Sequence, residues 1–181
     1  MDAGQQEAFD VAVAGASVFL TGGPGTGKSF TLRRIIEALK AKNGTDSVLV
    51  TAPTGVAALI AQGQTLHSSP GPGVPKGTTK DFGNMKGKAS AVIWERVKTL
   101  VIDEISMVDA EFFDWYMAHV PPGVQLVLCG DFVQLPPVPD KQERFFLPLS
   151  LSVCLSVCLS LSLSLVLSSS CSLCVSLSLA R

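Results

Sequence analysis

The stretch Gly22-Gly23-Pro24-Gly25-Thr26-Gly27-Lys28-Ser29 decides how this chain of 181 residues folds. It follows an apolar run, Val18–Thr21, that is typical of a buried strand, and it precedes apolar residues at helical spacing that begin at Leu32. The pattern G-x-x-x-x-G-K-[ST] between a strand and a helix predicts a loop whose backbone N–H groups surround phosphate oxygens. A glycine-rich turn without chemical function is the alternative, but such a turn needs no Lys-Ser pair at a helix start.

Two side chains at the end of this stretch have specific chemistry. Lys28 places a positive charge where the β and γ phosphates of ATP would lie, and Ser29 has a hydroxyl that suits a Mg²⁺ ion bridging those phosphates. We expect Lys28 to be catalytic and Ser29 to be a metal ligand. The expected nucleotide-binding residues in this part of the chain are Gly22, Gly23, Pro24, Gly25, Thr26, Gly27, Lys28, Ser29 and Phe30.

A pair of acids ends a second apolar run, because Asp103 and Glu104 follow Val101-Ile102 directly. Near a phosphate loop, one acid at a strand end can hold the metal ion and another can accept a proton from the attacking water. We expect Asp103 to be the second Mg²⁺ ligand and Glu104 to be the general base. A helix N-cap is the alternative role for such acids.

Four apolar runs predict strands that are buried on both faces. Helical patterns separate them, which indicates an α/β fold with a parallel sheet flanked by helices. Residues with candidate functions follow each run, and ligands of such sheets bind at the carboxyl ends of the strands. The predicted strands are Val18–Thr21, Val48–Thr51, Leu100–Asp103 and Leu126–Cys129.

Composition divides the chain near residue 146. Residues 1–146 are predicted to form one domain, and the net charge of -1 means that any contact with nucleic acid needs a local surface. Residues 147–181 form a Leu/Ser/Cys-rich tail, which we expect to be disordered, aggregation-prone or a truncation artefact, with a membrane span as the second interpretation. No targeting segment is recognised, which favours an intracellular protein. Only Cys129 lies outside the tail, which contains the other four cysteines: Cys154, Cys158, Cys171 and Cys174. We therefore predict neither disulfides nor a zinc site.

Five segments between residue 4 and about residue 139 resemble the motifs of the Pif-type, RecD-like branch of superfamily one DNA helicases. Gln5-Gln6-Glu7-Ala8-Phe9 is similar to the motif whose glutamine reads adenine, which implies that role for Gln5, with Gln6 as second candidate. The closest match is Trp94 with Val101–Asp109, and Gly130–Pro137 extends it. In the family, the glutamine of this last segment senses the γ phosphate, which implies a catalytic role for Gln134.

Two further segments, Thr51–Ala58 and Thr65–Ser68, resemble the family's motif for single-stranded DNA. The family has an aromatic residue where this chain has Ser69, so one base-stacking side chain is absent here. The Gly/Pro-rich, lysine-containing stretch from Ser69 to Lys88 is either a solvated loop or a contact to DNA phosphates. A histidine without this context would be a structural loop residue. The implied DNA-binding residues are Pro53, Thr54, Gly55 and His67.

The resemblance implies a RecA-like P-loop motor domain that binds ATP, Mg²⁺ and single-stranded DNA. It also implies a helicase of five-prime to three-prime polarity in DNA repair, recombination and telomere maintenance, in the nucleus or mitochondrion. The family's second motor domain and arginine finger do not follow Pro137, so we expect slow hydrolysis and no duplex unwinding by this chain alone. A non-catalytic ATP- or DNA-binding module and a general P-loop ATPase of protein remodelling are the two alternatives.

Overall fold

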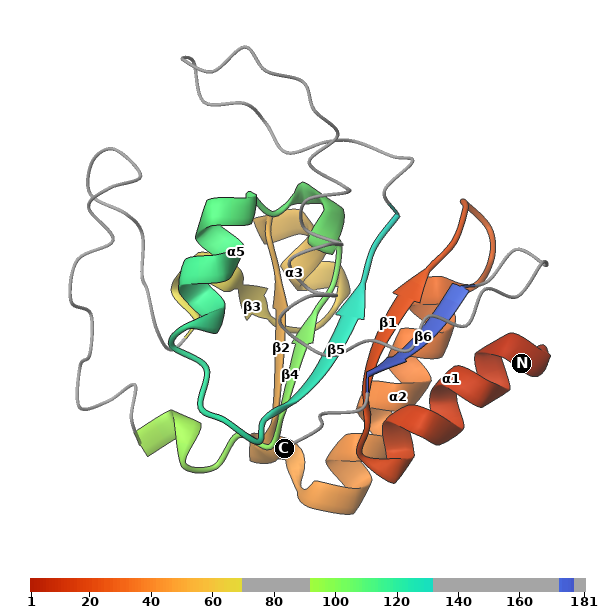
Figure 1. Ribbon diagram of the computed structural model, residues 1–181, viewed down its shortest axis with the longest axis horizontal. Helices are drawn as coiled ribbons and strands as arrows, with labels where there is room; N and C mark the ends of the chain where they lie inside the picture. The colour runs from red at the N-terminus through yellow and green to blue at the C-terminus, as the bar shows by residue number, and fades with distance from the viewer. Residues whose placement is uncertain (70–91, 132–172, 178–181) are drawn as a thin grey trace, which may run out of the picture.

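The computed structural model of this chain describes residues 1–69, 92–131 and 173–177. A six-stranded sheet lies between two layers of helices (Figure 1). In chain order the elements are α1 (Ala3–Ala14), β1 (Ser17–Thr21), α2 (Lys28–Asn43), η1 (Thr45–Ser47), β2 (Val48–Ala52), α3 (Gly55–Ile60), β3 (Gln64–Thr65), η2 (Leu66–Ser68), β4 (Thr99–Ile102), η3 (Ile105–Met107), α5 (Ala110–Met117), β5 (Gln125–Cys129) and β6 (Leu173–Leu177).

The sheet is parallel except for β6, and its strands lie in the order β3-β2-β4-β5-β1-β6. In the centre, Val101 of β4 lies opposite Val50 on one side and Val127 on the other. The predicted α/β class is confirmed, and the four predicted strands are β1, β2, β4 and β5. Because β4 ends at Ile102, Asp103 lies just beyond the strand. The strand β3 was not predicted, since its two polar residues produce no apolar pattern.

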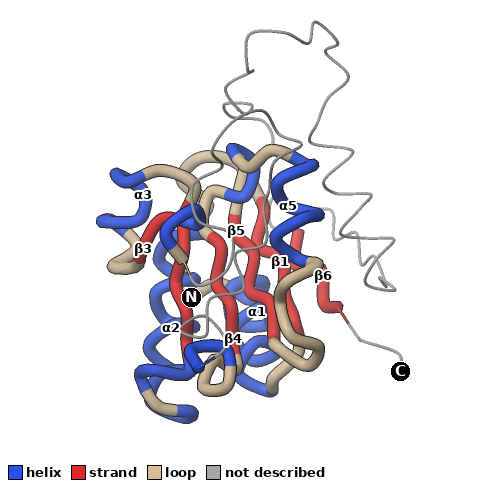
Figure 2. The backbone as a smooth tube through the Cα atoms, turned by 90° about the vertical axis from the view of Figure 1, so that its left-hand side faces the viewer, coloured by secondary structure: helices blue, strands red, loops and turns tan. Residues whose placement is uncertain are grey.

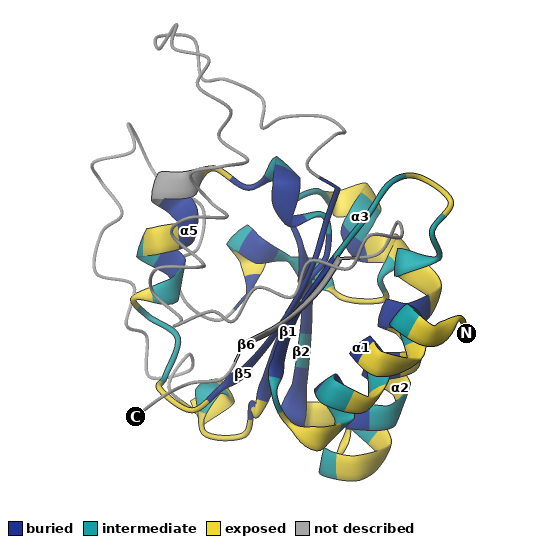
Figure 3. Ribbon diagram, turned by 45° about the vertical axis from the view of Figure 1, so that its right-hand side comes forward, coloured by how far each residue is buried: buried dark blue, intermediate teal, exposed yellow. Residues whose placement is uncertain are grey.

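Both faces of the sheet are buried, which explains the nearly continuous apolar sequence of its strands. Val18, Leu20 and Val101 face α1 and α2, whereas Phe19 and Leu100 face the layer that contains α5. Figure 3 shows buried strands between helices whose outer surfaces are exposed. The side chains of α2 at Leu32, Ile35, Ile36 and Leu39 are all buried, and each contributes about 1.5–3 kcal/mol of hydrophobic stabilisation.

A buried glutamine attaches α1 to the sheet. The side-chain amide nitrogen of Gln125 donates to the carbonyls of Ala12 and Ala16, at 2.7 Å in each case. Its amide oxygen accepts a hydrogen bond of 2.9 Å from the hydroxyl of Thr99. Every polar group of this buried side chain is therefore used, and the C-terminal end of α1 is fixed against β4 and β5.

The carboxyl ends of β1 to β5 meet along one edge of the sheet, because these strands are parallel. The segments that follow β1, β2, β4 and β5 lie at the top of the views in Figures 1 and 2. Most of the motifs found in the sequence follow these ends, except the Gln5–Phe9 motif, which lies in α1, and Trp94, which precedes β4. The topology therefore places the phosphate loop, the acidic pair and the predicted DNA-binding segments along the same edge, which we call the carboxyl edge.

One strand comes from the Leu/Ser-rich tail. Residues Leu173–Leu177 form β6, which pairs antiparallel with β1 so that Val175 lies opposite Phe19. Leu and Ser alternate in much of the tail, which is the period of a strand, whereas β6 itself has the sequence Leu-Cys-Val-Ser-Leu. The division of the chain at residue 146 stays a prediction. Over the described ranges, no helix is long and apolar enough to cross a lipid bilayer.

Candidate nucleotide site and DNA-binding segment

The loop between β1 and α2 has the backbone of a phosphate-binding turn. Gly22, Gly25 and Gly27 adopt φ angles of 149°, 78° and 79°, which L side chains rarely adopt. Gly27 is also the N-cap of α2, and no side chain caps this helix start. The first N–H groups of α2 therefore point toward the loop without an intrahelical partner, which is the arrangement that binds phosphate.

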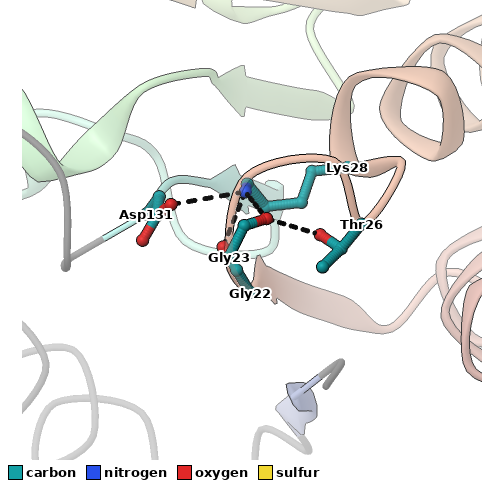
Figure 4. A network of polar contacts seen from close by, with 5 residues as sticks. All are labelled: Gly22, Gly23, Thr26, Lys28 and Asp131. Carbon is teal, nitrogen blue, oxygen red and sulfur yellow. Dashed lines mark hydrogen bonds and ion pairs between the residues drawn. The ribbon is translucent and has the colours of Figure 1, made fainter.

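Lys28 lies over this loop and connects it to a neighbouring strand (Figure 4). Its ammonium nitrogen donates to the carbonyl oxygens of Gly22 at 2.6 Å and Gly23 at 2.9 Å. The same nitrogen is 3.7 Å from a carboxylate oxygen of Asp131, just after β5. Thr26 closes the loop by donating its hydroxyl to the carbonyl of Gly23 at 2.9 Å. The positive charge is thus positioned between the loop and the carboxyl edge.

The acidic pair lies across β5 from the loop. The backbone N–H of Asp103 donates to the carbonyl of Thr51 at 2.9 Å, which extends the β2–β4 ladder by one bond. Asp103 then accepts a hydrogen bond of 3.0 Å from the N–H of Glu104. Glu104 has a φ of 53° and a ψ of 42°, an uncommon conformation for a residue with a side chain. The chain turns sharply here, directly after the strand.

The surroundings of Glu104 disfavour its negative charge. Burial raises the pKa of Glu104, the carboxylates of Asp103 and Asp131 raise it further, and the ammonium of Lys28 acts in the opposite direction. Burial also raises the pKa of the Cys129 thiol well above its ordinary value, with the Asp103 carboxylate as a further cause. Glu104 therefore has the raised basicity of a proton acceptor, whereas Cys129 remains a neutral buried thiol.

The residues predicted to hold Mg²⁺ provide oxygen donors. Ser29 is exposed in the first turn of α2, and Asp103, 9% exposed, follows β4. No group of three or more His, Cys, Asp or Glu side chains in the described ranges could hold a metal ion. Mg²⁺ does not require such a group, because it keeps several waters and takes its other ligands from one or two protein oxygens and from phosphates. The side chains present fit this ion.

Of the two glutamines predicted to read adenine, the structure places Gln5 beside the loop. The side-chain nitrogen of Gln5 donates to the carbonyl of Thr26 at 2.9 Å, and its oxygen accepts from the N–H of Asp2 at 3.1 Å. Gln6 instead donates to Asp10 on the exposed side of α1. Gln5 thus attaches the phosphate loop to α1, and Asp2 caps the start of this helix.

The predicted DNA-binding residues lie at the ends of β2 and β3. Thr54 is the N-cap of α3, and its hydroxyl accepts a hydrogen bond of 3.2 Å from the N–H of Ala57. Pro53 precedes it, and Gly55 begins the helix. His67 lies in η2, directly after β3, where its half-buried ring stacks on Phe112 of α5 with centroids 4.4 Å apart. Burial lowers the pKa of His67, so the ring is neutral at physiological pH.

The structure does not test some of the residues predicted from sequence, and it adds one that was not predicted. Gln134 lies outside the described residues, as do residues 70–88 of the lysine-containing stretch. Phe30 is 53% exposed on α2. Asp131 was missed as a site residue, although it lies directly beyond β5 in the segment that contains Gln134. Only its position next to Lys28, which a sequence pattern does not give, indicates its importance.

A phosphate loop between β1 and α2, together with acids beyond β4 and β5, defines a P-loop domain of RecA-like fold. The chain belongs to the PIF1-like helicase family, whose sequence model matches residues 1–168. The family resemblance inferred from the motifs is thus confirmed.

Relatives and solved structures agree with this assignment. The chain is 41% identical over 155 residues to the ATP-dependent DNA helicase PIF1 of Saccharomyces cerevisiae, an alignment that covers 78% of this chain and 18% of the relative. The Pif1 helicase of Candida albicans superposes with a TM-score of 0.66 at 39% identity, covering 77% of this chain and 34% of that one. Pif1 from Bacteroides, in complex with ADP-AlF3 and ssDNA, gives a TM-score of 0.62 at 36% identity, covering 79% of this chain and 35% of that one.

Proposed function

We propose that this chain is a motor domain of an ATP-dependent DNA helicase, which binds and hydrolyses ATP in a reaction coupled to single-stranded DNA. The observation that supports this most is the ammonium of Lys28, held between the carbonyls of Gly22 and Gly23 and the carboxylate of Asp131. The yeast relative is named an ATP-dependent DNA helicase, and the Bacteroides relative was crystallised with ADP-AlF3 and ssDNA.

The phosphate loop binds the triphosphate through its main chain. N–H groups of the loop and of the first turn of α2 donate to phosphate oxygens, and Lys28 adds a charge-assisted hydrogen bond to the β and γ phosphates. Ser29 and Asp103 would hold a Mg²⁺ ion, which would offset the negative charge of the phosphates. Gln5, at the base of the loop, contacts the adenine, a role that the family resemblance supports.

Glu104 accepts the proton of the attacking water. The pKa of this carboxyl is raised by burial and by Asp103, which makes its carboxylate a stronger base. Because only the carboxylate accepts a proton, turnover rises with pH through this raised pKa. Gln134 senses the γ phosphate and links hydrolysis to the DNA, by resemblance to the family's motif.

Single-stranded DNA lies over the ends of β2 and β3. Thr54, Gly55 and Pro53 approach its phosphates at the start of α3, and His67 contacts it from η2. By resemblance, the protein moves from five-prime to three-prime and acts in DNA repair, recombination and telomere maintenance, in the nucleus or mitochondrion.

Phosphate release with and without an oligothymidine tests this proposal against the two alternatives. We expect the chain with Mg²⁺ and ATP to release phosphate faster when the single strand is present. Nucleotide binding without turnover would instead identify a non-catalytic module. Turnover that is indifferent to DNA would identify a general P-loop ATPase, and absence of ATP binding would contradict the proposal altogether.

A further inference from the structure

The segment Thr65–Ser69, which contains His67 and which we call the DNA segment, has little support from the sheet. Its strand β3 pairs with β2 only at Gln64 and Thr65. Thr65 and Ser68 close a short turn through their own hydroxyls, 2.7 Å apart. The hydroxyl contact is local, and the pairing with β2 ends at Thr65, so neither fixes the position of His67 and Ser69 relative to the rest of the domain.

A buried hydrogen bond attaches the end of this segment to α5. Ser69 is 4% exposed, and its hydroxyl donates to the carbonyl of Leu66 at 2.6 Å. The same oxygen is 2.7 Å from the hydroxyl of Tyr116, which is 1% exposed. Since the proton of Ser69 is already used, the Tyr116 hydroxyl donates to it. Position 69, where the family has an aromatic residue, therefore points into the protein interior.

A second contact attaches the middle of the segment to the same helix. The ring of His67 stacks on Phe112 with an interplanar angle of 22°. Phe112 and Tyr116 are four residues apart, so they lie on one face of α5. Leu66, fully buried, packs in the same core cluster as both aromatic residues. Consecutive turns of α5 thus contact the segment at His67 and at Ser69.

Helix α5 is itself positioned by the segment that follows Asp103 and Glu104. Ile105 and Val108 lie in the core cluster that contains Phe112 and Tyr116. Asp109 caps the helix by accepting a hydrogen bond of 3.1 Å from the N–H of Phe112. A continuous packed layer therefore extends from the acidic pair to the DNA segment.

We propose that Tyr116 and Phe112 are positioning residues for DNA binding, which hold the DNA segment in its binding geometry through Ser69 and His67. This inference rests on the proposed function, because the segment's role in binding DNA is part of that proposal. Neither aromatic side chain needs to touch DNA for this effect. Their removal lowers DNA affinity and leaves the phosphate loop, which follows β1, unchanged.

The test compares variants of the full chain that each remove one buried hydrogen bond. Tyr116→Phe and Ser69→Ala remove the bond at the DNA segment, whereas Thr99→Val removes the bond from Thr99 to Gln125 at the opposite end of β4. Fluorescence anisotropy with a labelled oligothymidine measures DNA affinity, and a fluorescent ATP analogue measures nucleotide affinity. We expect the first two variants to bind DNA about 5-fold to 10-fold more weakly, and Thr99→Val to bind within about 2-fold of the parent. Ser69→Thr, which keeps the hydroxyl, should restore binding.

A spectroscopic signal separates positioning from a general loss of stability. The chain has one Tyr and two His residues, so their signals are simple to assign. The ring protons of His67 are shifted by the stacked Phe112, and we expect Tyr116→Phe to move this NMR signal while Thr99→Val leaves it in place. The nucleotide affinity should stay the same in all variants.

The outcomes distinguish this inference from the proposed function. If the parent chain binds no single-stranded DNA, the proposed function fails and the inference fails with it. If the parent binds DNA and both Tyr116→Phe and Ser69→Ala bind it as well as Thr99→Val does, only the positioning role is overturned.

Discussion

The phosphate loop and the DNA segment lie on the same carboxyl edge of the sheet, but they are held by different kinds of contact. The loop is held by polar contacts to its own main chain, from Lys28 to Gly22 and Gly23 and from Gln5 to Thr26. The DNA segment is instead held by side chains that enter the hydrophobic core beside α5.

This difference indicates how each region should respond to change. The contacts from Lys28 to Gly22 and Gly23 are between close neighbours in the sequence, and the Gln5 contact joins residues 21 apart, so substitutions at the loop should alter ATP binding with little effect on the DNA segment. Ser69 and Tyr116 are 47 residues apart in the chain, so the DNA segment depends on how distant elements pack. Variants of the two regions should therefore separate nucleotide binding from DNA binding.

The largest effect is expected for Glu104→Gln. Removal of the proton acceptor should lower ATP turnover by about 100-fold to 10,000-fold, the usual contribution of general base catalysis. ATP and DNA affinity should change little, since the substitution preserves size. Stopped-flow phosphate release measures the turnover, and Glu95→Gln, at an exposed acid, is the control. Equal turnover in the two variants would show that Glu104 is not the base.

Lys28→Ala should have the next largest effect. Charge-assisted hydrogen bonds to phosphate contribute about 1.5–3 kcal/mol each, so the loss of two weakens ATP binding by about 100-fold or more. DNA affinity without nucleotide should be unchanged if the two regions are independent. Titration calorimetry with Mg²⁺ and ATP gives the affinity. Arg33→Ala, which removes an exposed positive charge from the same helix, should bind ATP normally.

Gly27→Ala should give a smaller loss of ATP affinity, about 10-fold. A Cβ at this position would lie 2.5 Å from the side-chain nitrogen of Gln5, so the contact between Gln5 and Thr26 is lost. The φ of 79° adds about 1–2 kcal/mol of backbone strain.

Gly123→Ala is the matched control for that strain. Gly123 has a φ of 90°, but an added Cβ would meet no atom within 4 Å. Thermal unfolding should show similar destabilisation of the two variants, whereas only Gly27→Ala should weaken ATP binding. If both bind ATP equally well, the Gln5 contact is not important for the site.

Sequence and structure agree best where function is encoded locally. The roles predicted for Lys28 and Asp103 depend on the residues beside them and on the end of one strand, and both lie where the pattern places them. The burial of Ser69 and the charge of Asp131 beside Lys28 could not be predicted, because each depends on an element distant in the sequence. The pairing of β6 with β1 is a long-range contact of the same kind. The role of Gln134 stays a prediction.

The smallest effect is the contribution of His67 to the pH dependence of stability, which concerns the DNA segment and not the nucleotide site. Burial lowers the pKa of His67 in the folded protein, whereas in the unfolded chain it is near the ordinary value of 6.5. Near and below pH 6.5, the unfolded state therefore binds more protons at His67 than the folded state does. The folded state loses stability relative to the unfolded state as pH falls through 6.5 toward the folded pKa, and this loss is absent at higher pH. Between pH 8 and 5.5, we expect His67 to lower the Tm by about 2 °C or less, since the ring is only half-buried. Circular dichroism of the parent and of His67→Gln measures this contribution as the difference between their pH profiles. Identical profiles would mean that burial does not lower the pKa of His67, and would contradict the assignment of a neutral ring to the DNA segment.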